Sequence, residues 1–75
     1  MEVYRIDWVD NKGDVRNGAA WWHQLKDLVK ELLGNEEIVT ITIFDSVGKV
    51  IFKVTEDGVV IDECDIMKRV NKLEE

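Results

Sequence analysis

The sequence contains no proline, one cysteine, one histidine and no long apolar run. A single cysteine excludes a disulfide within one chain, so the domain must rely on its hydrophobic core. The apolar runs fall far short of the roughly 20 residues that a membrane-spanning helix needs, and Met1–Arg5 lacks the pattern of a secretory signal. We therefore expect a cytoplasmic protein without a membrane partner.

The same scarcity limits the chemistry that the chain can carry. One histidine and one cysteine are too few for the three or four nitrogen and sulfur ligands of a zinc site. Acidic residues at positions 62, 63 and 65 surround Cys64, and neighbouring carboxylates disfavour the thiolate that a nucleophile requires. The glycines are dispersed and form no phosphate-binding motif. The sequence therefore predicts no enzyme, no catalytic residue, no metal site, no cofactor and no small-molecule ligand.

The charge balance is acidic. Sixteen Asp and Glu residues against ten Lys and Arg residues give a formal net charge of −6. Binding to a phosphate backbone depends on clustered basic side chains, which release counterions when they neutralise phosphates. The composition therefore makes nucleic acid and anionic membranes unfavourable partners, and it is typical of a small soluble domain.

The residue mix also bears on the origin of the chain. Glu, Lys, Val and Ile are abundant, whereas Gln occurs once and Met twice. This bias is reported for proteins from hot environments, and an engineered sequence is the alternative source of it. The adjacent tryptophans at 21 and 22 and the polar stretch 10–17 are less regular than idealised designs. The composition favours a natural, thermophilic protein.

Four segments alternate apolar and polar residues with the period of a strand. They are residues 2–9, 37–45, 50–55 and 59–62. Asp10–Asp14 is dense in turn-forming residues and is predicted to be an exposed loop. A short hairpin closed by Val15–Arg16 is the second interpretation of this stretch.

Residues 18–33 show the periodicity of an amphipathic helix, with Asn17 as its N-cap and Gly34–Asn35 as its stop signal. The apolar stripe of this helix includes Trp21 and Trp22, which indicates core packing for both. Trp21 lies nearer the N-terminal end, where it is also available to the rim of an interface.

A second helix is predicted to follow Asp62, which is placed to cap it, with Asp65 in a capping-box position. Ile66, Val70 and Leu73 form its apolar stripe. Basic residues lie toward its C-terminal end, where the helix dipole favours positive charge.

These elements follow the order β-α-β-β-β-α, so residues 1–75 are predicted to form a single α+β domain. A right-handed crossover would place the first strand parallel to the second in a mixed four-stranded sheet of order 1-2-3-4, with both helices packed on one face. The register that keeps the apolar side chains together pairs Ile43 with Phe52. A two-residue turn of type I′ at Asp57–Gly58 then pairs Val54 with Ile61. The predicted core comprises Tyr4, Ile6, Trp8, Trp22, Leu25, Val29, Leu32, Val39, Ile41, Ile43, Val50, Phe52, Val54, Ile61, Ile66 and Val70.

The face of the sheet opposite the helices is the candidate binding surface. About half of its positions are apolar, and exposed apolar patches of more than about 400 Å² usually mark binding sites. The alternative is an ordinary mixed surface with scattered Val and Ile. The predicted interface residues are Val3, Val9, Ile38, Phe44, Ile51 and Val60, with Trp21 at the rim.

From Gly18 onward the order α-β-β-β-α resembles that of double-stranded-RNA-binding domains, in topology and without a shared motif. The resemblance implies association with nucleic acid through the last helix, where Lys68, Arg69 and Lys72 are the basic residues. Those domains open their second helix with a lysine cluster, whereas Glu63–Asp65 occupies that place here.

The leading functional prediction is a small non-enzymatic interaction domain that binds a protein or forms a homodimer through the helix-free face. The alternatives are a nucleic-acid-associated protein and an acidic inhibitor that imitates nucleic acid.

Overall fold

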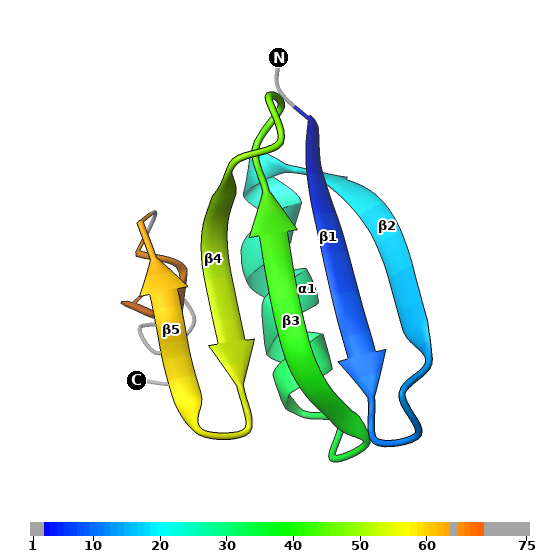
Figure 1. Cartoon of the computed structure of the whole chain (residues 1–75). Helices are drawn as coiled ribbons and strands as arrows, with labels where there is room; N and C mark the ends of the chain where they lie inside the picture. Colours follow the sequence, from blue (N-terminus) through cyan, green and yellow to red (C-terminus); the bar gives the residue numbers. More distant parts are fainter. Residues whose placement is uncertain (1–2, 64, 69–75) are drawn as a thin grey trace.

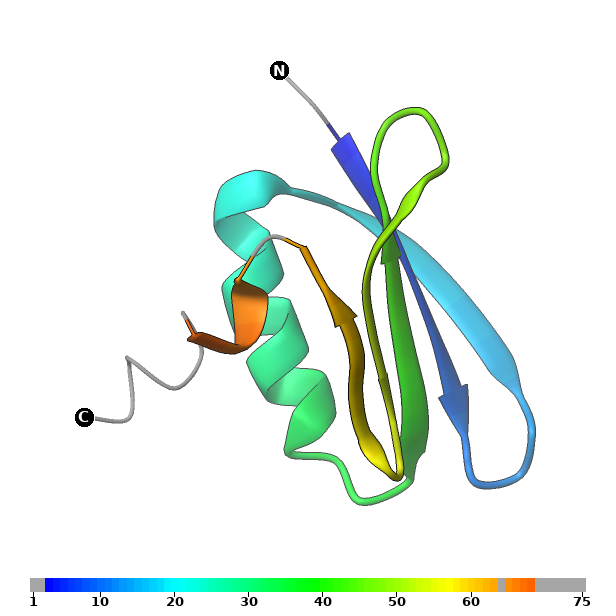
Figure 2. The ribbon, with the colours of Figure 1, turned by 60° about the vertical axis from the view of Figure 1, so that its left-hand side comes forward.

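The computed structural model describes residues 3–63 and 65–68 and contains one antiparallel sheet with one main helix. The sheet order is β2-β1-β3-β4-β5, and the helix α1 lies on one face of it (Figures 1 and 2). The prediction of a small α+β domain is confirmed at this level. The elements are β1 (Val3–Asp10), β2 (Val15–Trp21), α1 (Trp22–Leu33), β3 (Ile38–Phe44), β4 (Val50–Thr55) and β5 (Gly58–Asp62).

β2 corrects the predicted order of elements. Residues 15–21 form a strand that pairs antiparallel with β1, so the helix begins at Trp22 and not at Gly18. Asn17 is therefore a strand residue and caps no helix. The hairpin that was the second interpretation of this stretch is longer than expected and extends to the Val3–Trp21 pair.

The turn between β1 and β2 explains why the chain reverses here. One carboxylate oxygen of Asp10 accepts the backbone N–H groups of Lys12 and Asp14, at 2.9 and 3.0 Å. Gly13 has a φ of +86°, a left-handed conformation that glycine adopts without strain. The turn formers expected to make a solvated loop thus close a tight hairpin.

The hairpin also reverses the direction predicted for the first pairing. β1 runs antiparallel to β3, with Ile6 beside Ile43 and Trp8 beside Ile41. The predicted mixed four-stranded sheet of order 1-2-3-4 is wrong, because the chain has already turned back once along β2 before the helix begins. β2 and β3 both run antiparallel to β1, so they are parallel to one another, and α1 is the crossover connection between them with β1 in the middle.

Small residues allow the hairpin to pack beneath the aromatic side chains of β1. A Cβ atom at Gly18 would lie 3.7 Å from the ring of Trp8, so this ring covers the glycine. The next residue on the same face, Ala20, is buried at 5% exposure and stands beside Tyr4. The predicted helical stripe missed Ala20 as a core residue, because this stretch also fits a strand of small side chains.

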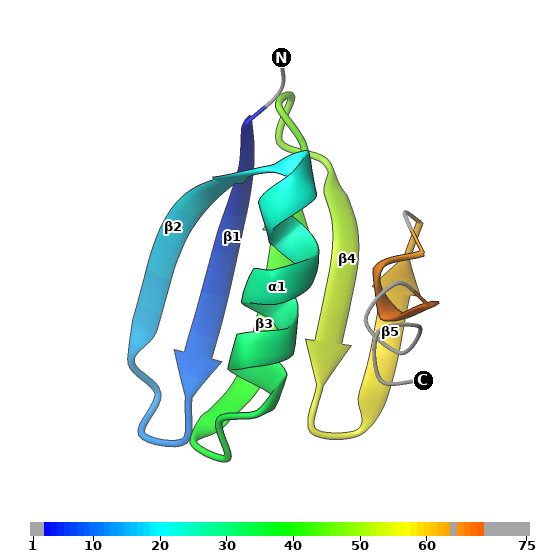
Figure 3. The ribbon, with the colours of Figure 1, turned by 180° about the vertical axis from the view of Figure 1, so that it is seen from behind.

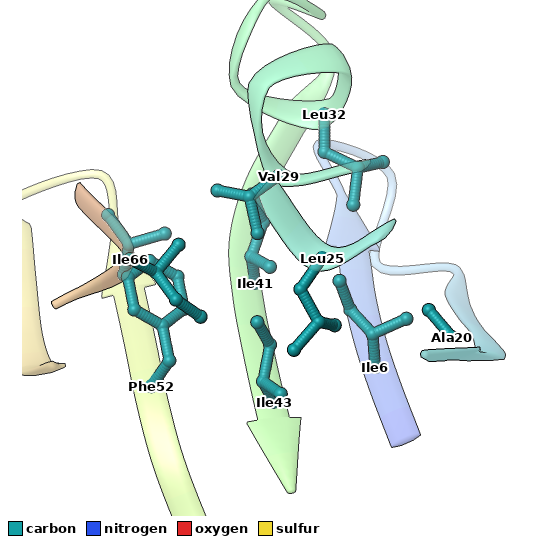
Figure 4. Packing of buried hydrophobic residues seen from close by; sticks show 10 residues of the cluster. Ile6, Ala20, Leu25, Val29, Leu32, Ile41, Ile43, Phe52 and Ile66 are labelled. Carbon is teal, nitrogen blue, oxygen red and sulfur yellow. The ribbon is translucent and has the colours of Figure 1, made fainter. Parts of the chain in front are cut away.

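The core lies between α1 and the sheet, as the apolar periodicities predicted. Leu25, Val29 and Leu32 point from the helix toward the strands (Figure 4). Tyr4, Trp8 and Trp22 are partly buried against this core, and the rings of Tyr4 and Trp22 are 5.6 Å apart between centroids. The buried cluster comprises Ile6, Ala20, Leu25, Val29, Leu32, Ile41, Ile43, Phe52, Val54 and Ile66.

Two predicted register pairs have different outcomes. Ile43 pairs with Phe52, as predicted. Val54 pairs with Val59 and not with Ile61, because the turn falls one position earlier, between Thr55 and Gly58, and a bulge follows it. Gly58 has a φ of +122°, which fixes the turn at this place.

Residues 66–68 form a helical turn at the end of the described part of the chain. Asp62 accepts the N–H groups of Ile66 and Met67 at 2.8 and 3.2 Å, so it caps this turn as predicted. The turn begins later than predicted, and Asp65, which precedes it, has a φ of +55°. This helical turn lies on the same side of the sheet as α1, and Ile66 lies beside Phe52 (Figures 2 and 4). The predicted core position Val70 and the stripe residue Leu73 lie outside the described residues.

Leu25→Ala tests the core assignment. The side chain is 1% exposed, so its truncation should lower the free energy of unfolding by about 2–5 kcal/mol. Leu33→Ala is the matched control on the same helix, at 40% exposure, and should cost less than about 1 kcal/mol. Urea denaturation measures both, and equal losses would contradict the placement of the core.

Asp62→Ala tests the cap. Loss of both acceptor oxygens should destabilise the protein by about 0.5–2 kcal/mol, because the two N–H groups lose their partners. Asp57→Ala makes the same chemical change in the exposed turn between β4 and β5 and should stay within about 0.5 kcal/mol of the parent. A cap variant as stable as this control in urea would argue against the observed hydrogen bonds.

Candidate functional site

The face of the sheet that points away from α1 is the candidate site, and we call it the helix-free face. On β1 it carries the side chains of Val3, Arg5, Asp7 and Val9, which alternate with the buried Ile6 and its neighbours. The described residues place no helix over this face, as Figure 2 shows in side view. The face is therefore open to contacts with another molecule.

The apolar residues of the helix-free face gather along β1 and β2. Val3 stands beside Trp21, and Val9 stands beside Val15, at the two ends of the hairpin. Val3, Val15 and Trp21 are 43%, 64% and 38% exposed, which is high for large apolar side chains. We call these four residues the hairpin apolar cluster.

The middle of the face is polar and internally paired. The guanidinium of Arg5 donates to both carboxylate oxygens of Asp7, from Nε at 2.9 Å and from a terminal nitrogen at 3.2 Å. The same guanidinium lies over the ring of Phe44, 5.5 Å from its centroid, which is a cation–π distance. Phe44 is thus a half-buried packing partner of Arg5 more than a free apolar contact.

A shallow depression of about 840 Å³ lies at the end of the face near the β3–β4 loop. Asp45 contributes to its wall, and one carboxylate oxygen of this residue accepts the N–H groups of Val47 and Lys49 at 3.0 and 2.9 Å. The carboxylate therefore holds its own loop together. The lining is formed by Val3, Tyr4, Arg5, Asn17, Gly18, Ala19, Phe44, Asp45, Ser46 and Gly48.

Bulges lie beside several of the predicted interface residues. Ile51 is the extra residue of a bulge in β4, and Ile38 follows a similar irregularity in β3. Both side chains are partly buried and pack against the core, so they expose less apolar surface than Val3, Val15 or Val60. Val60 is the extra residue of a bulge in β5 and is 61% exposed.

The structure places Val3 and Trp21 of the predicted set side by side at one end of the hairpin, and Val9 at the other end beside Val15, which the predicted set lacked. Val15 was considered only as part of a short hairpin, although it begins an alternation with Ala19 and Trp21. Trp21 was expected to be in the helical stripe and lies instead at the end of β2, where its N–H donates to Gln24 Oε1 at 2.9 Å. The period of two in residues 15–21 was the available signal.

Charge is unevenly distributed along the chain near this site. Residues 15–26 contain no Asp or Glu, although the whole chain has sixteen, and they contain Arg16 and Lys26. In residues 3–63 and 65–68, no three His, Cys, Asp or Glu side chains are grouped to hold a metal ion. Within the same part of the chain, no helix is long and apolar enough to cross a membrane.

Comparison with known proteins identifies no significant similarity. No family model matches the chain, and no curated protein or solved structure is significantly similar to it. The function is therefore inferred from the arrangement of residues described above.

Proposed function

We propose that this protein is a small non-enzymatic interaction domain that associates with a second copy of itself through the helix-free face. The observation that carries the proposal is the hairpin apolar cluster, three members of which are substantially exposed on a face that no described element covers. Burial of apolar surface is the main driving force of protein association, so covering this cluster with a second copy would stabilise a dimer.

The polar groups of the face favour binding over catalysis. Arg5 and Asp7 satisfy one another, and the carboxylate of Asp45 is occupied by the backbone of its own loop. A catalytic acid or base needs a group placed to exchange a proton with a substrate. These side chains instead form a fixed polar middle of the face, between the apolar pairs at the two ends of the hairpin.

Local charge supports contact between two copies of the chain. A net charge of −6 makes two copies repel one another on average. The segment that carries Val15 and Trp21 contains no carboxylate, so the repulsion is weakest where the apolar residues lie. The same acidic balance disfavours a partner with a phosphate backbone.

Mass measurement by light scattering tests self-association. We expect the weight-average mass to rise with protein concentration from the monomer value of 8.7 kDa toward twice that value. The rise should persist at high salt, because apolar contacts are not screened by ions. A mass that stays at 8.7 kDa at every accessible concentration would contradict the proposal.

Nucleic-acid binding is the alternative, and it is tested separately. Lys68 is exposed, next to the acidic positions 62, 63 and 65, while Arg69 and Lys72 lie outside the described residues. We expect no saturable change in the fluorescence anisotropy of labelled double-stranded RNA or DNA at low salt, where electrostatic binding is strongest. Saturable binding that weakens with added salt would favour the alternative.

A further inference from the structure

β2 is an edge strand without the features that protect most sheet edges. It runs for seven residues in unbroken register with β1 and contains no proline and one charged residue, Arg16. Natural edge strands are usually shortened, bulged, or supplied with lysine or proline, which prevents pairing with another chain. The opposite edge strand, β5, has five residues, a bulge at Val60, and one carboxylate, Asp62, at its end. The two edges therefore differ in their capacity to accept a further strand.

The hydrogen bonds of the hairpin determine which backbone groups β2 presents at its outer edge. The N–H of Asp10 donates to the C=O of Asp14 at 3.1 Å, so this pair and every second pair after it are the hydrogen-bonded pairs between β1 and β2. The alternation of an antiparallel ladder then directs the N–H and C=O groups of Val15, Asn17 and Ala19 away from β1. These groups form a regular row along the edge of the sheet, and Figure 3 shows β2 at that edge from the helix side.

We propose that β2 pairs antiparallel with β2 of a second copy of this chain, about a twofold axis that passes beside Gly18. The proposal rests on the self-association proposed above and names the element that joins the two copies. With Gly18 opposite Gly18, Asn17 faces Ala19 of the second copy and exchanges N–H···O=C hydrogen bonds with it. The symmetry repeats this pair, so the contact is complementary to itself.

The side chains single out this register. A pairing centred on Gly18 places Val15 opposite Trp21 of the second copy, and these are the two exposed apolar residues at the ends of β2. Val9 lies beside Val15 and Val3 lies beside Trp21, so each end of the contact becomes a continuous row of four apolar side chains. A pairing centred on Asn17 would place Val15 opposite Ala19 and leave Trp21 without an apolar neighbour on the other strand. Cross-strand apolar and aromatic pairs of this kind stabilise antiparallel sheets.

The helix side of the sheet also permits the contact. α1 lies over β3, two strands in from β2, and an axis perpendicular to the sheet keeps the two helices on the same side but apart (Figure 3). At the axis itself the residue is glycine, and Arg16 lies opposite Ala20 of the second copy. The two five-stranded sheets then form one continuous sheet, with the hairpin apolar clusters of both copies at the junction.

The charges of the two edge strands also favour pairing through β2. Pairing through β5 would bring the carboxylate of Asp62 from each of two acidic chains to the contact. Pairing through β2 brings together strands whose only charged residue is Arg16, which is not opposite itself in the proposed register.

Val15→Lys and Val60→Lys form a matched pair of variants, because the two valines are 64% and 61% exposed on opposite edges of the sheet. We expect Val15→Lys to raise the dimer Kd by at least about tenfold, since each substitution removes two apolar contacts by symmetry. Val60→Lys should change the Kd by less than about twofold, as a surface change outside the contact. Analytical ultracentrifugation measures both, and urea denaturation checks that both variants fold.

Two further variants test the hydrogen bonds and the register. Asn17→Pro removes an N–H that points away from β1, so it should weaken the dimer while the β1–β2 ladder is kept. In a Cys64→Ser background, Gly18→Cys should form a disulfide-linked dimer with glutathione disulfide, because directly opposed residues of a non-hydrogen-bonded pair have Cα atoms about 4.5 Å apart. Ala19→Cys should cross-link poorly, because this residue faces position 17 of the second copy.

The outcomes separate this proposal from the one on which it rests. A dimer that is unaffected by Val15→Lys and Asn17→Pro but is lost in Phe44→Asp would overturn edge pairing and leave self-association through stacked faces. A β2-dependent dimer in which Ala19→Cys cross-links better than Gly18→Cys would overturn the register. A protein that stays monomeric at all concentrations would overturn both proposals.

Discussion

The hairpin of β1 and β2 is the constraint on which the rest of the structure depends. One carboxylate oxygen of Asp10 and the left-handed conformation of Gly13 close its turn, so the chain reverses before the helix begins. β1 then has a partner on each side and becomes an interior strand, with Ile6 fully buried. β2 ends at Trp21 and α1 begins at Trp22, so the helix runs back across the sheet. β3 then lies antiparallel to β1.

This arrangement leaves open apolar surface and open backbone groups close together, on the helix-free face and at the outer edge of β2. The helix and the turn at Ile66 cover a single face of a five-stranded sheet, and the described residues leave the other face and the outer edge of β2 open. Arg5 and Asp7 pair across the middle of that face, so its polar groups need no partner. The apolar residues lie beside the open edge. A binding role follows from this combination, because backbone hydrogen bonds and apolar burial are both available along the same strand.

Much of the core was predictable from residue spacing alone. The period of 3.6 in Leu25, Val29 and Leu32 identified the buried stripe of α1, and the alternation through Ile41 and Ile43 identified the buried side of β3. Residues 15–21 were not predictable in the same way. Gly, Ala and Trp at these positions fit a helical stripe as well as a strand of period two, and the pairing of this segment with β1 resolves the choice. Bulges beside Ile38 and Ile51 were not predictable for a related reason, since an extra residue interrupts the alternation that the sequence pattern implies.

The sequence by itself determined that this is a small acidic α+β domain, which segments carry apolar faces, and that the pairing of Ile43 with Phe52 keeps those faces together. These properties depend on local periodicity and on composition, which the order of residues specifies directly. The tertiary structure decided that the chain has five strands, that β1 is interior and antiparallel to β3, and that Val15 and Trp21 lie at opposite ends of an open edge. Those features arise from contacts between distant segments, such as the pairing of β1 with both β2 and β3, which local propensity does not specify.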